Sequence, residues 1–320
     1  MIYLEQFTIP DEKTEETISH VQACNYWQKG YMDNRYPCEV FTDRELHSLD
    51  FSTVTILYGG NGSGKSTLLN LIAEKLHLNR LSPFNKSTIY NYYLEFCNYK
   101  LAYDDDDDEL EIPEHSRILT SDDVFDYMLN IRVNNENIDK SVEKARDYRE
   151  KLAFKQTIKI KSMEDYERLK EQLEARRLSG RKYVQKYVGE GIRPKSNGET
   201  ALRFFNSRIE NDILCLLDEP ENSMSPIFQI ELVKNIEDMA RFCGCQFIIA
   251  THSPFLLAIK NAKIYNLDAS PITLAKWWEL ENPKIYFDFF ISIKTYLLKT
   301  IIKQILIIIK MEHCKTFHFL

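Results

Sequence analysis

The sequence lacks the features that mark a secreted or membrane-inserted protein. Its seven cysteines are an odd number without regular spacing, so they do not read as a disulfide framework. The N-terminus, MIYLEQFTIPDEKTEE, has neither a basic start nor an apolar core and is not a signal peptide. The most apolar stretch, 289–309, is interrupted by Lys294, Lys299 and Lys303, whereas a membrane span needs about 20 largely uncharged residues. We therefore expect a cytoplasmic protein that does not insert into a membrane.

A strong charge of one sign is also missing from the chain as a whole. The 41 Lys and Arg against 48 Asp and Glu give a net charge of −7, which provides no general attraction to nucleic acid or an anionic membrane. The charge is unevenly distributed, however, because residues 140–195 hold 17 Lys and Arg against 9 Asp and Glu. Two interpretations stay open: a basic lobe that binds nucleic acid, or an ordinary solvated helical face, which is the more frequent case.

The order of the expected elements indicates an α/β fold. The run TVTILY at 53–58 predicts a buried strand, and helical apolar spacing follows it in LLNLIAEKL. Further strands are expected at 213–217 and 246–250, with a helix at 227–242 between them. This succession predicts a mostly parallel sheet flanked by helices.

Between the first expected strand and the second, the amino-acid composition changes twice. The aromatic stretch 87–96 (STIYNYYLEF) looks strand-like, and the acidic run 104–109 predicts a solvated loop. Residues 121–195 are charged and helical, with separate segments such as VFDYMLNIR and SVEKARDYREKLAF. Met163, Tyr166, Leu169 and Leu173 are spaced to share one helix face. We expect helices there, and this helical stretch is too short and too irregular for a long coiled-coil arm.

A glycine-rich loop follows the first strand. Residues 59–66 (GGNGSGKS) fit G-x-x-x-x-G-K-[ST] between a strand and a helix, which is the context the motif requires. The glycines let the backbone curve around a phosphate, and the helix N-terminus adds its dipole. Lys65 supplies a positive charge for the β- and γ-phosphates, and the Ser66 hydroxyl is a ligand for Mg²⁺. The predicted site for ATP and Mg²⁺ comprises Gly59, Gly60, Asn61, Gly62, Ser63, Gly64, Lys65, Ser66 and Thr67.

Two carboxylates end the second expected strand. Asp218 and Glu219 directly follow the apolar run ILCLL at 213–217. This pattern places Asp218 beside Mg²⁺ and Glu219 over the γ-phosphate, where Glu219 can orient or deprotonate the attacking water. An apolar run before Asp-Glu is common by chance, and it becomes specific only after a phosphate loop.

With these two motifs the chain resembles the ABC-class P-loop ATPases, which include transporter ATPase subunits, SMC-type proteins and related soluble ATPases. The segment 195–199 (KSNGE) precedes Asp218 where this class has its LSGGQ-like signature, and His252 follows a strand where the class has its switch histidine. The resemblance covers 40–270 and implies a P-loop NTPase fold of the ABC-ATPase type with an inserted helical lobe.

The resemblance also implies a mechanism. In this class the signature of one subunit closes over the ATP held by the phosphate loop of the other. Ser196 and the backbone N–H of Gly198 would then reach the γ-phosphate in trans, while His252 contacts it in cis together with Lys65 and Glu219. The chain would form a homodimer when ATP is bound, and hydrolysis would reopen it.

The particular residues of the motifs indicate a branch within the class. The segments SNGE, DEPENSMSP and QFIIATHSPFLLA are most similar to stand-alone soluble bacterial ATPases of the AAA-family or ABC type. The signature reads SNGE rather than SGGQ, Ser225 stands where an Asp is usual, and no Q-loop glutamine can be assigned. We expect a soluble ATPase acting on nucleic acid or on an unknown protein partner. The alternative is an ATPase subunit that docks on a separate permease.

Four parts follow from this reading. Residues 1–120 form the first part of a nucleotide-binding lobe, and 121–195 form the inserted helical lobe. Residues 196–285 complete the nucleotide-binding lobe with the signature, Asp218, Glu219 and His252. The tail 286–320 packs either as an edge element or as a helix.

Overall fold

The computed structural model describes residues 1–18, 35–104, 106–154, 163–188, 196–294 and 296. The chain divides into two compact units. The sheet unit comprises Met1–Ser121 and Asn206–Leu320, and the helical unit comprises Asp122–Phe205. Residues 196–205, which the sequence prediction groups with the nucleotide-binding lobe, are thus part of the helical unit.

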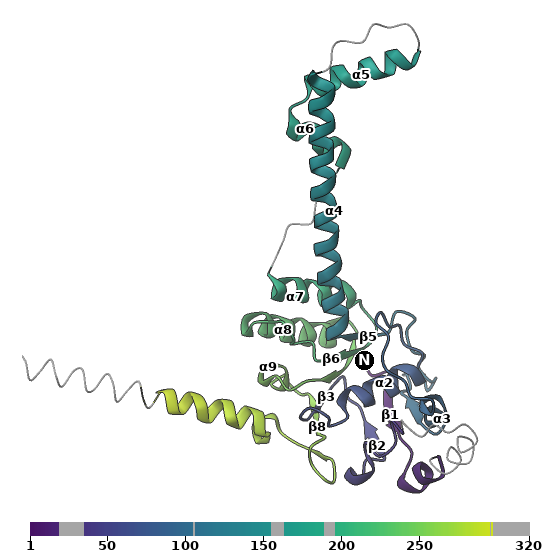
Figure 1. Cartoon of the computed structure of the whole chain (residues 1–320). Helices are drawn as coiled ribbons and strands as arrows, with labels where there is room; N and C mark the ends of the chain where they lie inside the picture. Colours follow the sequence, from purple (N-terminus) through teal and green to yellow (C-terminus); the bar gives the residue numbers. More distant parts are fainter. Residues whose placement is uncertain (19–34, 105, 155–162, 189–195, 295, 297–320) are drawn as a thin grey trace, which may run out of the picture. The chain divides into compact units, whose positions relative to one another are not determined.

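The sheet unit contains a six-stranded sheet in the order β5-β6-β7-β3-β8-β9, of which β5, β6, β3 and β8 are labelled in Figure 1. The six strands are β5 (Arg117–Thr120), β6 (Leu214–Asp218), β7 (Gln246–Ala250), β3 (Val54–Tyr58), β8 (Lys263–Asn266) and β9 (Thr273–Leu274). Neighbours are parallel from β5 to β8, and β9 pairs antiparallel with β8. The mostly parallel α/β fold and the three predicted strands are confirmed. Because they run parallel, β3, β6 and β7 all end at the same edge of the sheet.

Helices cover both faces of this sheet, which explains the continuous apolar runs of its strands. Leu216 of β6 belongs to the core cluster that also contains the apolar residues of α2 (Lys65–Lys75). Leu217 is equally buried but points to the opposite face, because side chains alternate along a strand. On that face α8 (Pro226–Phe242) contacts β7. The predicted helices at the phosphate loop and at 227–242 are therefore confirmed.

A second, three-stranded antiparallel sheet has the order β2-β1-β4, with β2 (Ser48–Asp50), β1 (Leu4–Thr8) and β4 (Asn98–Leu101). Two side chains of the main sheet bond to its backbone: the Tyr265 hydroxyl of β8 donates to the Asp50 carbonyl (2.9 Å) and accepts the Asp50 N–H (3.0 Å), and Gln246 bonds near β1. Gln246, at the start of β7, is fully buried, and its Oε1 accepts hydrogen bonds from the N–H groups of Tyr3 (2.8 Å) and Leu4 (2.9 Å). Its Nε2 donates to the carbonyls of Leu4 (2.8 Å) and Ser52 (3.2 Å).

The strand-like reading of 87–96 is wrong. Its centre forms helix α3 (Tyr90–Glu95), in which Tyr90 and Tyr93 are fully buried. Residues three apart share a helix face, so two aromatic side chains enter the core together. Aromatic content predicted a strand because β-propensity reflects packing against a half-buried surface more than a backbone preference. The described residues of the acidic run 104–109 are exposed and lie in a loop, as predicted.

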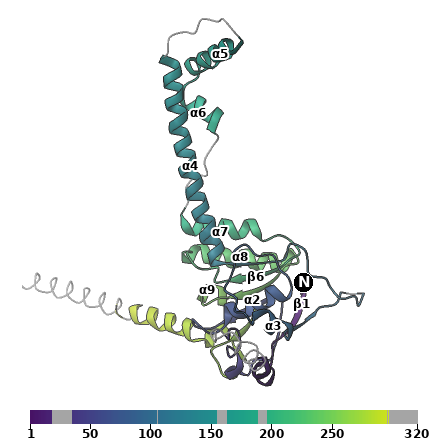
Figure 2. The same ribbon diagram turned by 45° about the vertical axis from the view of Figure 1, so that its right-hand side comes forward.

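The helical unit begins with one long helix rather than several short ones. Helix α4 (Ser121–Phe154) has 34 residues and is drawn as one unbroken helix in both views (Figures 1 and 2). Its length is about 51 Å at 1.5 Å per residue. Buried or half-buried side chains recur along it at alternating spacings of four and three, at Val124, Met128, Ile131, Asn135, Ile138, Val142 and Ala145. This is the spacing of a coiled-coil seam, so these residues are more regular than the sequence reading allowed, while the absence of a long coiled-coil arm stays a prediction. Because Asn135 is polar and Ala145 is small, counting large apolar residues along the sequence does not reveal this four-and-three repeat.

Helices α5 (Met163–Arg177) and α6 (Gly180–Val188) follow, and α7 (Asn197–Arg208) leads back to the sheet unit. The far end of α4 is bonded to α5. Gln172 and Arg176 donate to the carbonyls of Leu152 and Ala153 at the end of α4, at 3.1 and 3.0 Å. Gln172 is buried, whereas Leu173, predicted on the apolar face, is 53% exposed. The side chains of Met163 and Tyr166 lie outside the described residues.

Part of the basic surplus of 140–195 has a structural role. Arg149 donates to the Leu178 carbonyl after α5, at 2.9 and 3.2 Å, and Arg176 caps α4 in the same way. Such bonds satisfy carbonyls that a helix end leaves without partners. Five of the 17 basic residues lie outside the described residues: Lys155, Lys159, Lys161, Arg193 and Lys195.

The C-terminal part contains a helix over 281–294, which decides the open reading of residues 286–294 in favour of a helix. Its apolar side chains are largely exposed, including Phe287 (65%) and Phe290 (62%). Residues 297–320 lie outside the described residues. Among the described helices, none combines the length and the hydropathy that crossing a membrane requires.

Candidate functional site

The glycine loop joins the carboxyl end of β3 to the amino end of α2, as predicted. Gly62 and Gly64 have φ angles of +80° and +93°, a region in which only glycine is free of strain. A Cβ atom on Gly64 would lie 2.6 Å from Cε1 of Phe41, so the loop also needs glycine there for space. The loop therefore has the curved backbone that a phosphate requires at the start of a helix.

Lys65 is buried at the first position of α2. Its Nζ donates to the carbonyls of Gly59 (2.8 Å) and Gly60 (3.0 Å) and lies 3.8 Å from Oε1 of Glu219. The side chain is only 4% exposed, so a charge is held in a region largely shielded from water. An ammonium in that position attracts an anion more strongly than one on the surface.

Ser66 and Asp218 supply adjacent oxygen atoms. Oγ of Ser66 donates to Oδ1 of Asp218 at 3.0 Å, so the hydroxyl that begins α2 meets the carboxylate that ends β6. Burial raises the pKa of Asp218 to about 6, although the Ser66 hydrogen bond opposes that shift. A hydroxyl beside a carboxylate is a donor set that suits Mg²⁺, and a bound cation would stabilise the charged form of Asp218.

Glu219 lies among three polar side chains. Its Oε1 is 3.4 Å from Nε2 of His252 and 3.8 Å from Nζ of Lys65, and its Oε2 accepts a hydrogen bond from Nδ2 of Asn222 at 3.2 Å. The Glu219 backbone has φ +49°, and its N–H donates to the Ala250 carbonyl at 2.9 Å. The carboxylate is 26% exposed and so remains accessible to water.

His252 follows β7 and reaches the same place. Its Nδ1 is 3.5 Å from the Gly59 carbonyl, and its Nε2 is the atom that faces Glu219. A neutral imidazole donates from only one nitrogen, so it can make one of these two contacts, whereas a doubly protonated ring can make both. The structure thus brings Lys65, Glu219 and His252 together.

The remaining predicted loop residues lie where the motif places them. Asn61 is exposed at the tip of the loop, while Ser63 and Thr67 are buried. The predicted signature residues belong to the helical unit. Oγ of Ser196 accepts the N–H of Glu199 at 3.2 Å, and Gly198 is buried in the first turn of α7.

Sequence reasoning missed several residues that hold this site. Asp268 accepts the Gly60 N–H with both carboxylate oxygens, at 2.8 and 3.0 Å, and Arg44 donates to the Ser63 carbonyl. Glu221 is a buried carboxylate just beyond Glu219. Asp268 is 208 residues from Gly60, so no local pattern marks it. The only sequence signal was the third acidic residue of DEPE, at position 221.

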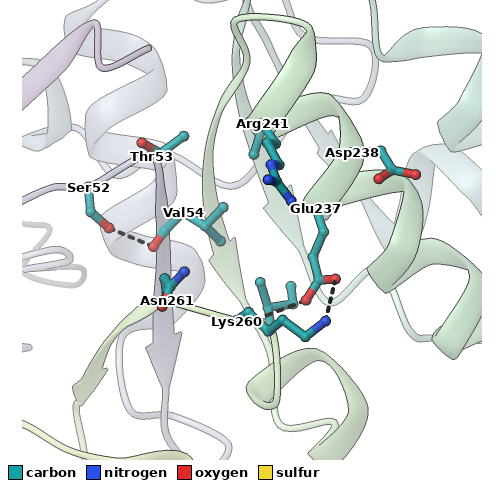
Figure 3. Close-up of a pocket in the computed structure, with 10 residues that line it drawn as sticks. Ser52, Thr53, Val54, Glu237, Asp238, Arg241, Lys260 and Asn261 are labelled. Carbon is teal, nitrogen blue, oxygen red and sulfur yellow. Dashed lines mark hydrogen bonds and ion pairs between the residues drawn. The ribbon is translucent and has the colours of Figure 1, made fainter.

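A cavity of 710 Å³ opens elsewhere, between the amino end of β3 and the carboxyl-terminal half of α8 (Figure 3). Ser52, Glu237 and Lys260 are among its lining residues. Oγ of Ser52 donates to the Val54 carbonyl at 2.7 Å, and Glu237 pairs with Lys260 at 4.0 Å. None of the predicted site residues lines it.

No protein-family model matches the sequence, and no curated protein is similar to it. Among solved structures, the Smc head domain of Pyrococcus furiosus with an extended coiled coil, bound to the C-terminal domain of ScpA, is 12% identical. That match covers 90% of this chain and 100% of that chain, with a TM-score of 0.39. The dimeric ATP-binding cassette MJ0796, in a post-hydrolysis state with ADP and Pi, is 15% identical over 72% of this chain and 88% of that chain (TM-score 0.33). CbiO1 from Clostridium perfringens, part of the ABC transporter complex CbiONQ, is 18% identical over 73% and 84% (TM-score 0.28).

Proposed function

We propose that the chain binds ATP with Mg²⁺ and hydrolyses the bond between the β- and γ-phosphates. One observation carries the proposal. Five groups meet at the carboxyl ends of three adjacent parallel strands. They are the curved glycine loop, the Lys65 ammonium, the hydroxyl–carboxylate pair of Ser66 and Asp218, the Glu219 carboxylate and the His252 imidazole. Each group matches a separate requirement of phosphoryl transfer, which depends mainly on positioning and charge stabilisation.

The residues divide the work by their chemistry. The amides of the loop and the Lys65 ammonium bind the phosphate oxygens, and the buried position of Lys65 strengthens that attraction. Ser66 and Asp218 would hold Mg²⁺, which would supply positive charge to stabilise the phosphates. Glu219 orients the attacking water and accepts its proton, and His252 lies beside it as a donor to the γ-phosphate.

The proposal includes an ATP-closed homodimer. Its support is the resemblance of the segment 195–199 to a signature, together with the chemistry of Ser196 and the Gly198 N–H as donors to a partner's γ-phosphate. A nucleic-acid partner for 140–195 stays a prediction without a specific observation in its favour, because Arg149 and Arg176 of that segment bind helix carbonyls. The permease-docking alternative likewise has no observation in its favour.

The test uses Glu219→Gln, which keeps the shape of the side chain and removes its basicity. Turnover should fall by roughly 10²–10⁴, the usual contribution of a general base, while ATP binding with Mg²⁺ is retained. The retained ATP should shift the protein to a dimer in size-exclusion chromatography. Repeating the run with DNA tests the nucleic-acid branch.

Two variants serve as controls. Glu231→Gln changes an exposed carboxylate on α8 and should leave both turnover and elution unchanged. Lys65→Ala should remove ATP binding in calorimetry. The proposal fails if wild-type protein takes up no ATP in the presence of Mg²⁺, or if Lys65→Ala takes it up equally well.

A further inference from the structure

A second buried carboxylate lies beside the site and makes no hydrogen bond to the glycine loop, Lys65, Ser66 or Asp218. Glu221 is 8% exposed. Its Oε1 accepts three hydrogen bonds, from Oγ1 of Thr251 (2.6 Å), the His252 N–H (3.0 Å) and the Ser253 N–H (3.1 Å). Three donors from three consecutive residues therefore converge on one oxygen atom.

This arrangement replaces the strand hydrogen bonds that the chain loses at this point. β7 ends at Ala250, and the Thr251 N–H still donates to the Leu57 carbonyl at 3.2 Å. Beyond it, the His252 N–H donates to Glu221, and the Ser253 N–H is shared between Glu221 (3.1 Å) and Oγ1 of Thr251 (3.0 Å). Buried N–H groups need an acceptor, so the Glu221 oxygen substitutes here for the carbonyls of a neighbouring strand.

A second connection holds the segment from the other side. Oγ of Ser253 donates to Oε1 of Gln229 at 2.6 Å, and Nε2 of Gln229 donates to the Met224 carbonyl at 3.0 Å. Met224 lies in the loop between Glu219 and α8. The backbone on both sides of His252 is thus fixed to the segment that follows Glu219.

The position of the His252 ring depends on that backbone. Its contacts with Glu219 (3.4 Å) and the Gly59 carbonyl (3.5 Å) are both at the outer limit of hydrogen-bonding distance. A backbone shift of about 1 Å would break them, and misplacements of that size cost up to about 10²-fold in rate.

We propose that Glu221 is a positioning residue for His252: its carboxylate fixes the backbone of 251–253 so that the imidazole faces Glu219. The inference rests on the proposed ATPase function for its effect on rate, but the positioning itself does not require turnover. Removal of Glu221 therefore lowers kcat far more than it changes ATP affinity, because Glu221 makes no hydrogen bond to the glycine loop or Lys65 and its charge is the smallest of the named influences on Asp218.

The experiment compares Glu221→Ala with Glu237→Ala in the full chain. Glu237 is a matched control, since its Oε1 also accepts a backbone N–H, that of Lys260 at 3.0 Å, but in the cavity of Figure 3. Glu221→Ala should lower kcat by roughly 10- to 100-fold with less than about a threefold change in ATP affinity. Glu237→Ala should change neither. Glu221→Gln keeps an acceptor oxygen and should have an intermediate effect.

Two further readouts separate positioning from a general loss of structure. In a double-mutant cycle, Glu221→Ala should cost little additional rate once His252 is already alanine, because both changes act through the same ring. An additive loss would overturn the inference. NMR of histidine-labelled, nucleotide-free protein should show the His252 ring resonances displaced in Glu221→Ala and unchanged in Glu237→Ala. Unmoved His252 resonances in Glu221→Ala refute the positioning even if the wild-type protein hydrolyses no ATP. Displaced resonances without any wild-type ATP binding would instead refute the proposed function alone.

Discussion

Replacing Gln246 with methionine tests how strongly the two sheets depend on one side chain. Gln246 is fully buried, and its amide makes four hydrogen bonds to the backbone of β1 and of the segment before β3. Methionine has nearly the same length and volume, so the substitution removes the hydrogen bonds without opening a large cavity. The expected loss in the free energy of unfolding therefore measures the cost of leaving buried hydrogen-bonding groups without partners, rather than the cost of poorer packing.

The magnitude follows from the groups left without their partner. The N–H groups of Tyr3 and Leu4 both donate to Oε1 of Gln246, and each buried donor left unsatisfied costs about 1–3 kcal/mol. We expect the free energy of unfolding to fall by about 2–6 kcal/mol, which is a large part of the stability of a typical domain.

Urea unfolding followed by circular dichroism measures this change, with Gln6→Met as the control. Gln6 lies in β1 and donates to Asp50 at the surface, at 2.8 Å, so its replacement should alter the free energy by less than about 0.5 kcal/mol. A loss below about 1 kcal/mol for Gln246→Met would contradict the reasoning, because it would mean that water or a backbone shift satisfies both donors.

Two more predictions concern the site. Gly64→Ala should weaken ATP binding at least tenfold in calorimetry, because an alanine at φ +93° is strained by about 1–2 kcal/mol and its Cβ would clash with Phe41. Gly60→Ala is the control, since its Cβ would have no neighbour nearer than 3.8 Å, and equal losses in both variants would argue against a steric cause. Asp218→Asn should abolish Mg²⁺-dependent ATP binding yet stabilise the nucleotide-free protein at neutral pH. The pKa of Asp218 is raised from 3.8 to about 6, so the folded state holds this proton more tightly than the unfolded state, and stability decreases as pH rises through that interval. The variant should gain up to about 3 kcal/mol at pH 7.5 relative to pH 4 in thermal unfolding with EDTA, and a pH-independent difference would refute the assignment.

Several features could be predicted from contiguous residues because the chemistry that needs them is local. A phosphate loop requires glycines, a lysine and a hydroxyl at fixed spacing, so the strand, loop and helix at 54–75 were predicted correctly. The acidic pair at 218–219 follows its strand for the same reason, and parallel strand order then places it next to Ser66. The trans roles of Ser196 and Gly198 stay predictions, since they concern a second copy of the chain.

One segment was mispredicted, and the regularity of another was missed, because their residues are compatible with more than one interpretation. The aromatic run at 87–96 suits a strand by composition, and only packing in the core makes it helix α3. The seam of α4 contains Asn135, so an apolar count does not detect its heptads.

By itself the sequence predicted the class of the fold and the residues proposed to bind phosphate, metal and water, because each motif is a short run of adjacent residues whose chemistry is local. Only the tertiary structure decided which distant groups support them. The bonds of Asp268 to Gly60, of Gln246 to Leu4 and of Glu221 to His252 join segments 208, 242 and 31 residues apart. Such partners meet because the order of the strands in the sheet brings their ends together, and that order is not encoded in any local pattern.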